Sequence, residues 1–208
     1  TSTGALSFSS APNYESPTDS DSGNNYVVVV RATDSASNTS DQTVTISVVD
    51  VDELDPNITG PSGSAGASSS TKSINENTTT VHTFSANETV TWSLNGGIDA
   101  AKFSIESSTG ALTFTSSPDY ESPTDTDSGN DYIVVVQATD SAGNTSDQTV
   151  TISVADIDEV APIITGPSGS AGDATSSKSI NENVALIHTF TADENVTWSL
   201  DQSSSSLF

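Results

Sequence analysis

The sequence contains no cysteine and only four basic residues among 208. Without cysteine the chain cannot form disulfides, thiol-based active sites or zinc sites built from cysteine. Because most eukaryotic extracellular modules carry some cysteine, a surface protein of this composition is predicted to be prokaryotic or viral. The four bases are Arg31, Lys72, Lys102 and Lys178. A nucleic-acid backbone and an anionic membrane surface both require basic patches, so neither is a predicted partner.

Long apolar runs and catalytic motifs are also missing. No stretch resembles a signal peptide or a membrane span, and no segment has a convincing helical period. There is no serine in a Gly-x-Ser-x-Gly turn and no glycine-rich phosphate loop that opens a helix. Hydrophobic residues make up only 32% of the chain, which suits thin all-β modules with much exposed surface. An enzyme is therefore not predicted.

Acidic residues are abundant: the sequence has 28 of them and a net charge of −24. So much like charge destabilises a compact module through self-repulsion. Bound divalent cations would neutralise acids that cluster, whereas high external salt would screen acids that are scattered. The two remedies can coexist, and acids that recur in clusters favour bound cations.

The sequence repeats with a period of 106 residues. Ile74–Asn77 recurs as Ile180–Asn183, and Trp92 recurs as Trp198. A fixed period of this length indicates tandem modules whose role comes from the array. We therefore expect three parts: the C-terminal half of a repeat at 1–56, a complete repeat at 57–162, and the N-terminal half of a third at 163–208.

The complete repeat is predicted to contain seven short strands. Val, Ile, Thr, Tyr and Phe dominate them, and Gly, Asn, Asp, Ser and Pro separate them. Their expected ranges are a strand near 72–75 and then 79–84, 89–94, 103–105, 111–114, 132–138 and 148–154. Apolar alternation along these runs predicts two antiparallel sheets packed as a Greek-key β-sandwich, repeated in tandem. The Gly/Ser-rich stretch at 60–70 is predicted to be a flexible surface loop.

Acidic elements recur at the ends of the predicted strands. They are Glu76 in Asn-Glu-Asn, Asp119 and Glu121 around a tyrosine, Asp140 in Ala-Thr-Asp, and the junction acids at 50–53 and 156–159. Loops that connect strands add Asn87-Glu88 and Asp193-Glu194. Calcium binds six to eight oxygen ligands, mostly carboxylates and carbonyls, and acids from several loops at one end of a sandwich supply such a set. The sequence therefore predicts calcium sites at the module ends.

The ordered set of these motifs resembles the cadherin repeat. That family has, in this order, an xEN segment, a D-x-E segment, a V-x-A-x-D segment and a D-x-N-D-N-x-P linker. Here the linker is DVDELDP at Asp50–Pro56 and DIDEVAP at Asp156–Pro162. The turn Ser108–Leu112 before a strand also looks like that family. The resemblance covers the whole chain and implies cadherin/Ig-like seven-stranded sandwiches with Ca²⁺ held between successive modules.

The resemblance also implies which residues bind Ca²⁺. At the 56/57 junction the implied ligands are Glu15, Asp50, Asp52, Glu53, Glu88 and Asp140. At the 162/163 junction they are Glu76, Asp119, Glu121, Asp156, Asp158, Glu159 and Asp193. The chain departs from the family where Asn13 replaces the first acid of D-x-E and where Leu54 and Val160 replace an oxygen donor. These departures leave the number of ions per junction open.

Two further features have competing interpretations. Oxygens at alternate positions in Asp125–Asp131, with a glycine in the turn, resemble a short calcium loop, but a solvated turn is favoured. His82 and His188 are lone histidines within strands, so a zinc site is not predicted, and Trp92 and Trp198 are predicted core residues.

The predicted function is structural or adhesive. We expect a calcium-rigidified repeat of an extracellular filament, stalk or giant surface adhesin, whose partners are neighbouring repeats or copies joined head to tail. The half-repeats at the two ends are expected to be completed by a neighbouring copy, either covalently continuous with them or in another subunit. The alternative is that the sequence is an arbitrary window of a longer repetitive chain. Alternatives are a module that binds a cell-surface glycan or protein, and an accessory region of a secreted enzyme. The expected location is extracellular or on a cell surface.

Overall fold

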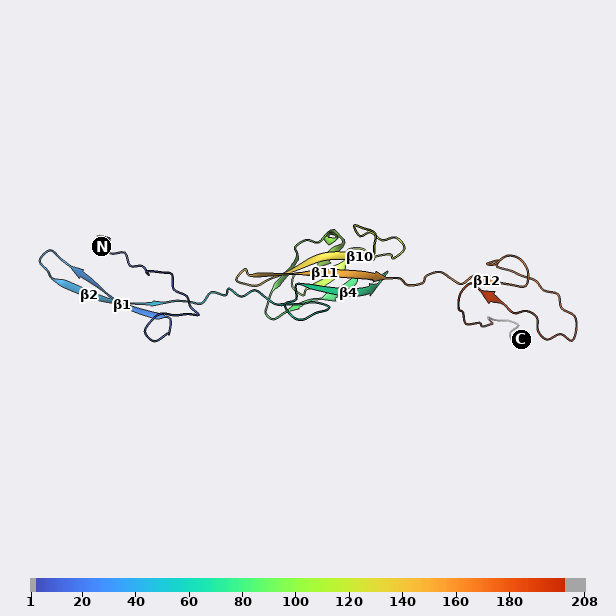
Figure 1. Cartoon of the computed structure of the whole chain (residues 1–208), viewed down its shortest axis with the longest axis horizontal. Helices are drawn as coiled ribbons and strands as arrows, with labels where there is room; N and C mark the ends of the chain where they lie inside the picture. Colours follow the sequence, from blue (N-terminus) through green and yellow to red (C-terminus); the bar gives the residue numbers. More distant parts are fainter. Residues whose placement is uncertain (1–2, 201–208) are drawn as a thin grey trace. The chain divides into compact units, whose positions relative to one another are not determined.

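A computed structural model describes residues 3–200 of the chain (Figure 1). The chain divides into two compact units, Thr1–Asp156 and Ile157–Phe208. Strands dominate, and the one helical element among the described residues is a single 3₁₀ turn, η1, at Ala100–Lys102. No helix in this part of the chain has the length and apolar character needed to cross a membrane.

The central module is a β-sandwich. One sheet has the order β4-β11-β10-β7, a second has the order β5-β9-β8, and β3 pairs with β6 beside them. The strands are β3 (Ile58–Thr59), β4 (Ser69–Asn75), β5 (Thr80–Thr83), β6 (Ser85–Ala86), β7 (Thr91–Leu94), β8 (Phe103–Ile105), β9 (Ala111–Phe114), β10 (Asp131–Thr139) and β11 (Thr145–Ala155). All pairs are antiparallel except β4 with β11, which is parallel. The predicted all-β sandwich is confirmed, and each predicted strand run overlaps an observed strand. The prediction that both sheets are antiparallel is wrong for β4 and β11, which run parallel.

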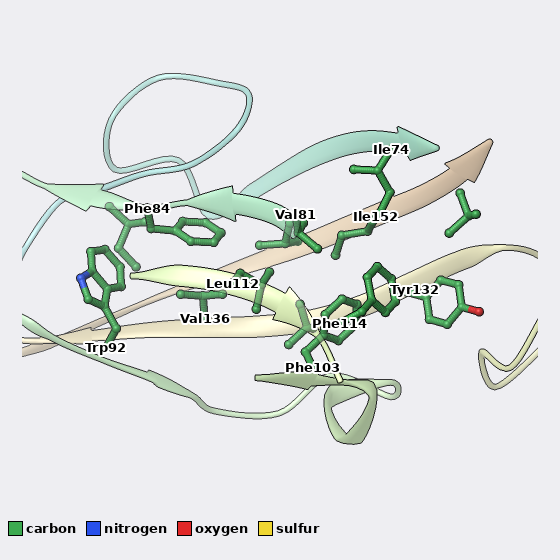
Figure 2. Packing of buried hydrophobic residues seen from close by; sticks show 14 of the residues in the cluster. Ile74, Val81, Phe84, Trp92, Phe103, Leu112, Phe114, Tyr132, Val136 and Ile152 are labelled. Atoms are coloured by element: carbon green, nitrogen blue, oxygen red, sulfur yellow. The ribbon is translucent and has the colours of Figure 1, made fainter. Parts of the chain in front are cut away.

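The core lies between the two sheets. Alternate residues of β10 and β11 point inward, and Tyr132, Val134, Val136, Val150 and Ile152 are fully buried. Aromatic rings pack together within the cluster: Phe103 and Phe114 have centroids 4.3 Å apart, and Phe114 meets Tyr132 edge-on at 5.0 Å. Trp92 packs against Phe84 toward one end of this core, away from Tyr132 (Figure 2). The prediction that Trp92 is a core residue is therefore confirmed. The same prediction is wrong for Trp198, which is 49% exposed.

The Gly/Ser-rich stretch after β3 is fixed by Gln148, a fully buried side chain of β11. Ser70 Oγ donates a hydrogen bond to Gln148 Oε1 at 2.9 Å, and Gln148 Nε2 donates to the Ala67 carbonyl at 2.8 Å. A Cβ on Gly60 would lie 1.9 Å from Gln148 Oε1, so the glycine makes room for the amide. The prediction of a flexible loop over 60–70 is wrong at its end, where Ser69 and Ser70 belong to β4.

The segment 3–56 contains one hairpin, formed by β1 (Asn25–Thr33) and β2 (Thr39–Ser47). Its register repeats that of the central hairpin: Tyr26 faces Ile46 as Tyr132 faces Ile152. The second unit contains one short pair, β12 (Ile164–Thr165) with β13 (Thr191–Ala192), which repeats β3 with β6. The division into two half-repeats around a complete one stays a prediction.

Gly97 is required because its backbone packs directly against the backbone of β10. Gly97 has φ +95°, and a Cβ there would lie 2.5 Å from both the Ile133 carbonyl oxygen and Val134 Cα. We expect Gly97→Ala to lower the free energy of unfolding by about 2–4 kcal/mol, through left-handed strain plus this clash. Gly143→Ala is the matched control, since Gly143 has φ +99° and open space around it. Urea unfolding checks this prediction, and equal losses in the two variants would contradict it.

Candidate metal sites at the module ends

The first acidic group lies in the segment before the central module. Carboxylate oxygens of Glu15, Asp50 and Glu53 all lie within 4.8 Å of one another, and the three side chains are exposed. Asp50 and Glu53 belong to the segment that follows β2, and Glu15 comes from the loop that precedes β1. The fold therefore gathers three predicted ligands from two separate stretches of sequence.

The second acidic group joins that same segment to the central module. Carboxylate oxygens of Asp52, Glu88 and Asp140 again lie within 4.8 Å of one another. Asp140 directly follows β10, and Glu88 lies between β6 and β7. Asp52 is exposed, Glu88 is half-buried and Asp140 is buried. All six residues predicted for the 56/57 junction thus lie in these two groups.

Asp140 is held in place by hydrogen bonds from the turn between β10 and β11. Its Oδ1 accepts from the backbone N–H groups of Ala142, Gly143 and Asn144 at 2.7–2.8 Å. Asn144 Nδ2 donates to Asp140 Oδ2 at 2.8 Å and to the Asp52 carbonyl at 2.9 Å. Burial alone raises the pKa of Asp140, but the hydrogen bonds from Asn144 and the turn outweigh it and lower the pKa. This carboxylate is therefore fixed, charged and available as a ligand.

The pKa of Glu88 is shifted in the opposite direction, to above its ordinary value. Burial raises its pKa, and the neighbouring carboxylates of Asp52 and Asp140 raise it further. Like charges brought together at a partly desolvated place disfavour the ionised form. A divalent cation between these oxygens would remove that repulsion, because it replaces carboxylate–carboxylate contacts with cation–carboxylate contacts.

The third acidic group lies at the opposite end of the central module. It contains Glu76, Glu121 and Asp156, with carboxylate oxygens within 4.8 Å of one another. Glu76 directly follows β4 and is 1% exposed, and its Oε2 accepts a hydrogen bond from the Tyr120 N–H at 2.8 Å. The Glu76 N–H donates to the Ala155 carbonyl at 3.0 Å, which ties it to the end of β11. A buried carboxylate beside two others is costly unless hydrogen bonds or a bound cation stabilise the charge.

The period relates the first and third groups. Glu15 and Asp50 correspond to Glu121 and Asp156 one repeat later. Each group adds one more acid: Glu53 after the linker aspartate in the first, and Glu76 after β4 in the third. The two groups therefore share two corresponding acids and are copies of one recurring site at the C-terminal end of a module.

The remaining predicted ligands are not in a group of three acids among residues 3–200. Asp119 Oδ1 accepts from the Ser122 N–H at 2.9 Å, and Asp158 Oδ1 accepts from the Val160 N–H at 3.0 Å. Asp193 Oδ1 accepts from the Ile163 N–H at 2.7 Å, and Glu159 is exposed in the same segment. Asp119 lies in the central module, and the other three belong to the second unit.

Sequence reasoning missed Glu194 as a ligand candidate. Burial raises the pKa of Glu194, and so do the charges of Asp158 and Asp193 and a hydrogen bond with Asp158. This repeats the first junction, because Glu194 and Asp158 are the copies of Glu88 and Asp52. Asp193 instead copies Asn87, whose Oδ1 accepts from the Asn57 N–H at 2.6 Å. The period itself was the signal that pointed to Glu194.

The stretch Asp125–Asp131 forms a turn in which the carboxylates accept hydrogen bonds from the turn itself and from a neighbouring strand. Asp125 Oδ2 accepts from the Gly129 N–H at 2.8 Å, and Asp127 Oδ1 accepts from the same group at 3.2 Å. Asp131 binds Ser153 Oγ across the β10–β11 pair. These bonds support the interpretation as a turn.

The acidic groups among the described residues contain no histidine, and His82 stacks edge-on against Phe84 at 5.0 Å.

Comparison with protein families identifies the central module. The family "Cadherin domain" matches residues 68–155. This stretch of the chain matches a cadherin domain and is a cadherin-like repeat, and we call the central module that contains it the cadherin domain. The family consists of non-enzymatic adhesion domains of extracellular proteins, and its members generally bind Ca²⁺. The resemblance noted in the sequence is thereby confirmed for the central module.

Solved cadherin structures are similar to the chain at low identity. The protocadherin GammaB4 extracellular domain is 22% identical over 72% of this chain and 24% of that one, with a TM-score of 0.45. Human CDH23 EC21-23 is 22% identical over 85% of this chain and 56% of that one, also with a TM-score of 0.45. The chain thus spans between a quarter and just over half of these structures. Comparison with the curated proteins finds no match.

The raised pKa of Glu88 predicts a pH dependence of the metal-free cadherin domain. Between the ordinary glutamate pKa of 4.5 and the raised value, the folded chain binds more protons than the unfolded chain. Stability is therefore expected to rise as the pH falls from about 7 through the raised pKa of Glu88. Glu88→Gln should weaken this rise, whereas the exposed control Glu106→Gln should keep it. Urea midpoints in chelator measure both, and identical pH profiles of the two variants would count against the assignment.

Proposed function

We propose that the chain is a run of extracellular cadherin-type repeats whose junctions bind Ca²⁺ and are stiffened by it. Its role is that of a filament, a stalk or a giant surface adhesin, with neighbouring repeats or copies joined head to tail. The location is extracellular or on a cell surface. The match of residues 68–155 to an adhesion family supports the general class. The arrangement of the linker acids supports the calcium-dependent role.

One observation carries the proposal. Asp52 and Glu53 are consecutive residues of the linker, yet their carboxylates lie in two different acidic groups. Glu53 lies with acids of the preceding segment, and Asp52 lies with acids of the cadherin domain. Cations bound to both groups would hold a single short stretch of linker from both sides. The linker would then no longer allow the two modules to rotate freely relative to each other.

The residues present fit Ca²⁺. The six acids at the first junction offer carboxylate oxygens only, which is the ligand type that hard divalent cations prefer. When bound, the cation supplies charge neutralisation and oxygen coordination. The chain itself orients Asp140 through the turn hydrogen bonds and anchors the linker through Asn144 to the Asp52 carbonyl. At the other end, Glu76, Glu121 and Asp156 would hold the corresponding ion.

The energetic effect of one site is modest, and that of an array is large. Extracellular calcium sites have a Kd of about 10⁻⁴–10⁻³ M. Free calcium about tenfold above Kd stabilises the bound state by about 1.4 kcal/mol per independent site. Summed over many junctions, this would make the array responsive to external calcium.

Calorimetric titration of the 208-residue chain with Ca²⁺ tests the proposal. We expect saturable binding that is weakened by Glu88→Gln and by Glu76→Gln, since each variant removes a carboxylate from one group. Glu106→Gln is the control, because Glu106 is exposed and its Oε1 accepts from Ser108 Oγ at 3.3 Å, away from the three groups. If all three variants bind like the parent chain, the acidic groups are not the sites.

A further inference from the structure

Asn95 and Gly96 form the one Asn-Gly pair in the sequence. They directly follow β7, an edge strand of the four-stranded sheet, and both residues are exposed. In such a pair the next backbone nitrogen reaches the side-chain amide carbon with little steric hindrance, because glycine has no Cβ. The pair is therefore a candidate site of covalent modification, and it lies outside the three acidic groups.

The structure leaves the nitrogen of Gly96 accessible. Within the described part of the chain the Gly96 N–H donates no hydrogen bond, whereas the Asn95 N–H donates to the Val135 carbonyl at 2.9 Å. The Gly96 carbonyl accepts from the Val135 N–H at 2.8 Å. Gly96 has φ +125°, and apart from its chain neighbours no described atom lies within 4 Å of the place where a Cβ would be. The backbone here has room to turn toward the Asn95 side chain.

The side chain of Asn95 connects two strands that are not neighbours. Its Nδ2 donates to Asp147 Oδ2 of β11 at 2.9 Å, although β10 lies between β7 and β11 in the sheet. The other oxygen, Asp147 Oδ1, accepts from Gln137 Nε2 of β10 at 3.0 Å. In the preceding repeat Arg31 stands in the place of Gln137 and donates two hydrogen bonds to Asp41. The cadherin domain thus surrounds this aspartate with neutral amides where the preceding repeat uses a cation.

We propose that Asn95 deamidates spontaneously and that the conversion releases the end of β7 from β11. The Gly96 nitrogen forms a bond to Asn95 Cγ, the bond from Cγ to Nδ2 breaks, and the proton lost by Gly96 leaves with Nδ2 as ammonia. The product is a cyclic imide between the two residues. Water then opens the ring at either carbonyl and leaves aspartate or isoaspartate at position 95. The step needs no oxidant or reductant, and water is its one co-reactant.

The conversion changes the charge at the edge of the sheet. A carboxylate at position 95 would face Asp147 where an amide now donates, and like charges held side by side on a sheet are destabilising. β7 pairs with β10 through Thr91–Leu94 alone, so the contacts of Asn95 hold its C-terminal end. Isoaspartate would in addition lengthen the main chain beside the two Val135 hydrogen bonds. The modification therefore loosens this edge of the cadherin domain as the protein ages.

Peptide mapping by mass spectrometry of the 208-residue chain during a long incubation at neutral pH tests the chemistry. We expect Asn95 to be the first asparagine converted, with both aspartate and isoaspartate among the products. Asn75 and Asn87 are matched references, since both are exposed and followed by glutamate. Asn95→Gln should stay unconverted over the same period, because its longer side chain closes the ring slowly. Conversion of a reference before Asn95, or no conversion of Asn95, would overturn the proposal.

Melting temperatures at neutral pH test the consequence for the sheet. Asn95→Asp, which imitates one product, should lower the melting temperature by about 2–6 °C, as expected for the loss of one exposed hydrogen bond in a domain of this size. Gln137→Arg should raise it more in the Asn95→Asp chain than in the parent, because the guanidinium would bind the carboxylates as Arg31 binds Asp41. An unchanged melting temperature of Asn95→Asp, or an equal effect of Gln137→Arg in both chains, would overturn the release of β7.

Discussion

Replacing Trp92 with alanine is expected to lower the free energy of unfolding of the cadherin domain by about 3–5 kcal/mol. Trp92 is 6% exposed, packs on Phe84 at 5.9 Å and lies against Gly110, where a Cβ would come within 3.0 Å of the indole. Neighbours held in two sheets cannot collapse into the space that the ring leaves. Urea unfolding followed by circular dichroism measures the loss.

Trp198→Ala is the matched control for this prediction. Trp198 is the copy of Trp92 and makes the same tilted contact with Phe190 at 6.1 Å, yet it is 49% exposed. We expect this variant to leave the unfolding of the cadherin domain unchanged. Similar losses in both variants would mean that the buried core is not what stabilises the domain.

Replacing Asp140 with alanine is expected to abolish the calcium-dependent rise in melting temperature that comes from the first junction. The change removes one of the three carboxylates in the group with Asp52 and Glu88. We expect calcium affinity at this group to fall by about 10–100-fold or more, since even outer-shell changes have effects of that size. The melting temperature without calcium should also fall, because the turn after β10 loses the acceptor of four hydrogen bonds.

Asp34→Ala separates these two effects. Asp34 is the copy of Asp140 and accepts the same kind of bonds from Ala36 and Asn38, but it is not in an acidic group among the described residues. Its turn should therefore weaken while calcium binding stays as in the parent chain. Equal loss of calcium response in the two variants would show that Asp140 acts through the turn and not as a ligand.

The strands could be predicted because their signal is local. In β10 every inward position is Tyr, Val or Ala, and the alternation alone identifies the face. β3 and β6 were not predicted, since two-residue strands have no period to detect. The ordering of the Gly/Ser stretch depends on Gln148, which lies 78 residues from Ser70 in the sequence. Composition cannot reveal a hydrogen-bond partner at that separation.

The candidate site was predictable to a similar extent. The linker acids, Glu88 and Asp140 are set by short motifs, and the fold brings them together. The choice between Asp193 and Glu194 could have been made from the period, because Glu194 is the copy of Glu88 and Asp193 is the copy of Asn87. The burial of Glu76 also depends on packing against the end of β11, which no local pattern encodes. Whether these acids bind Ca²⁺ stays a prediction.

Small-angle X-ray scattering of the 208-residue chain during a calcium titration tests the central claim most directly. We predict that added Ca²⁺ narrows the distribution of dimensions and fixes the angle at the 56/57 junction, and that chelator reverses the change. Scattering curves that stay the same from chelator to millimolar calcium would contradict calcium-stiffened junctions.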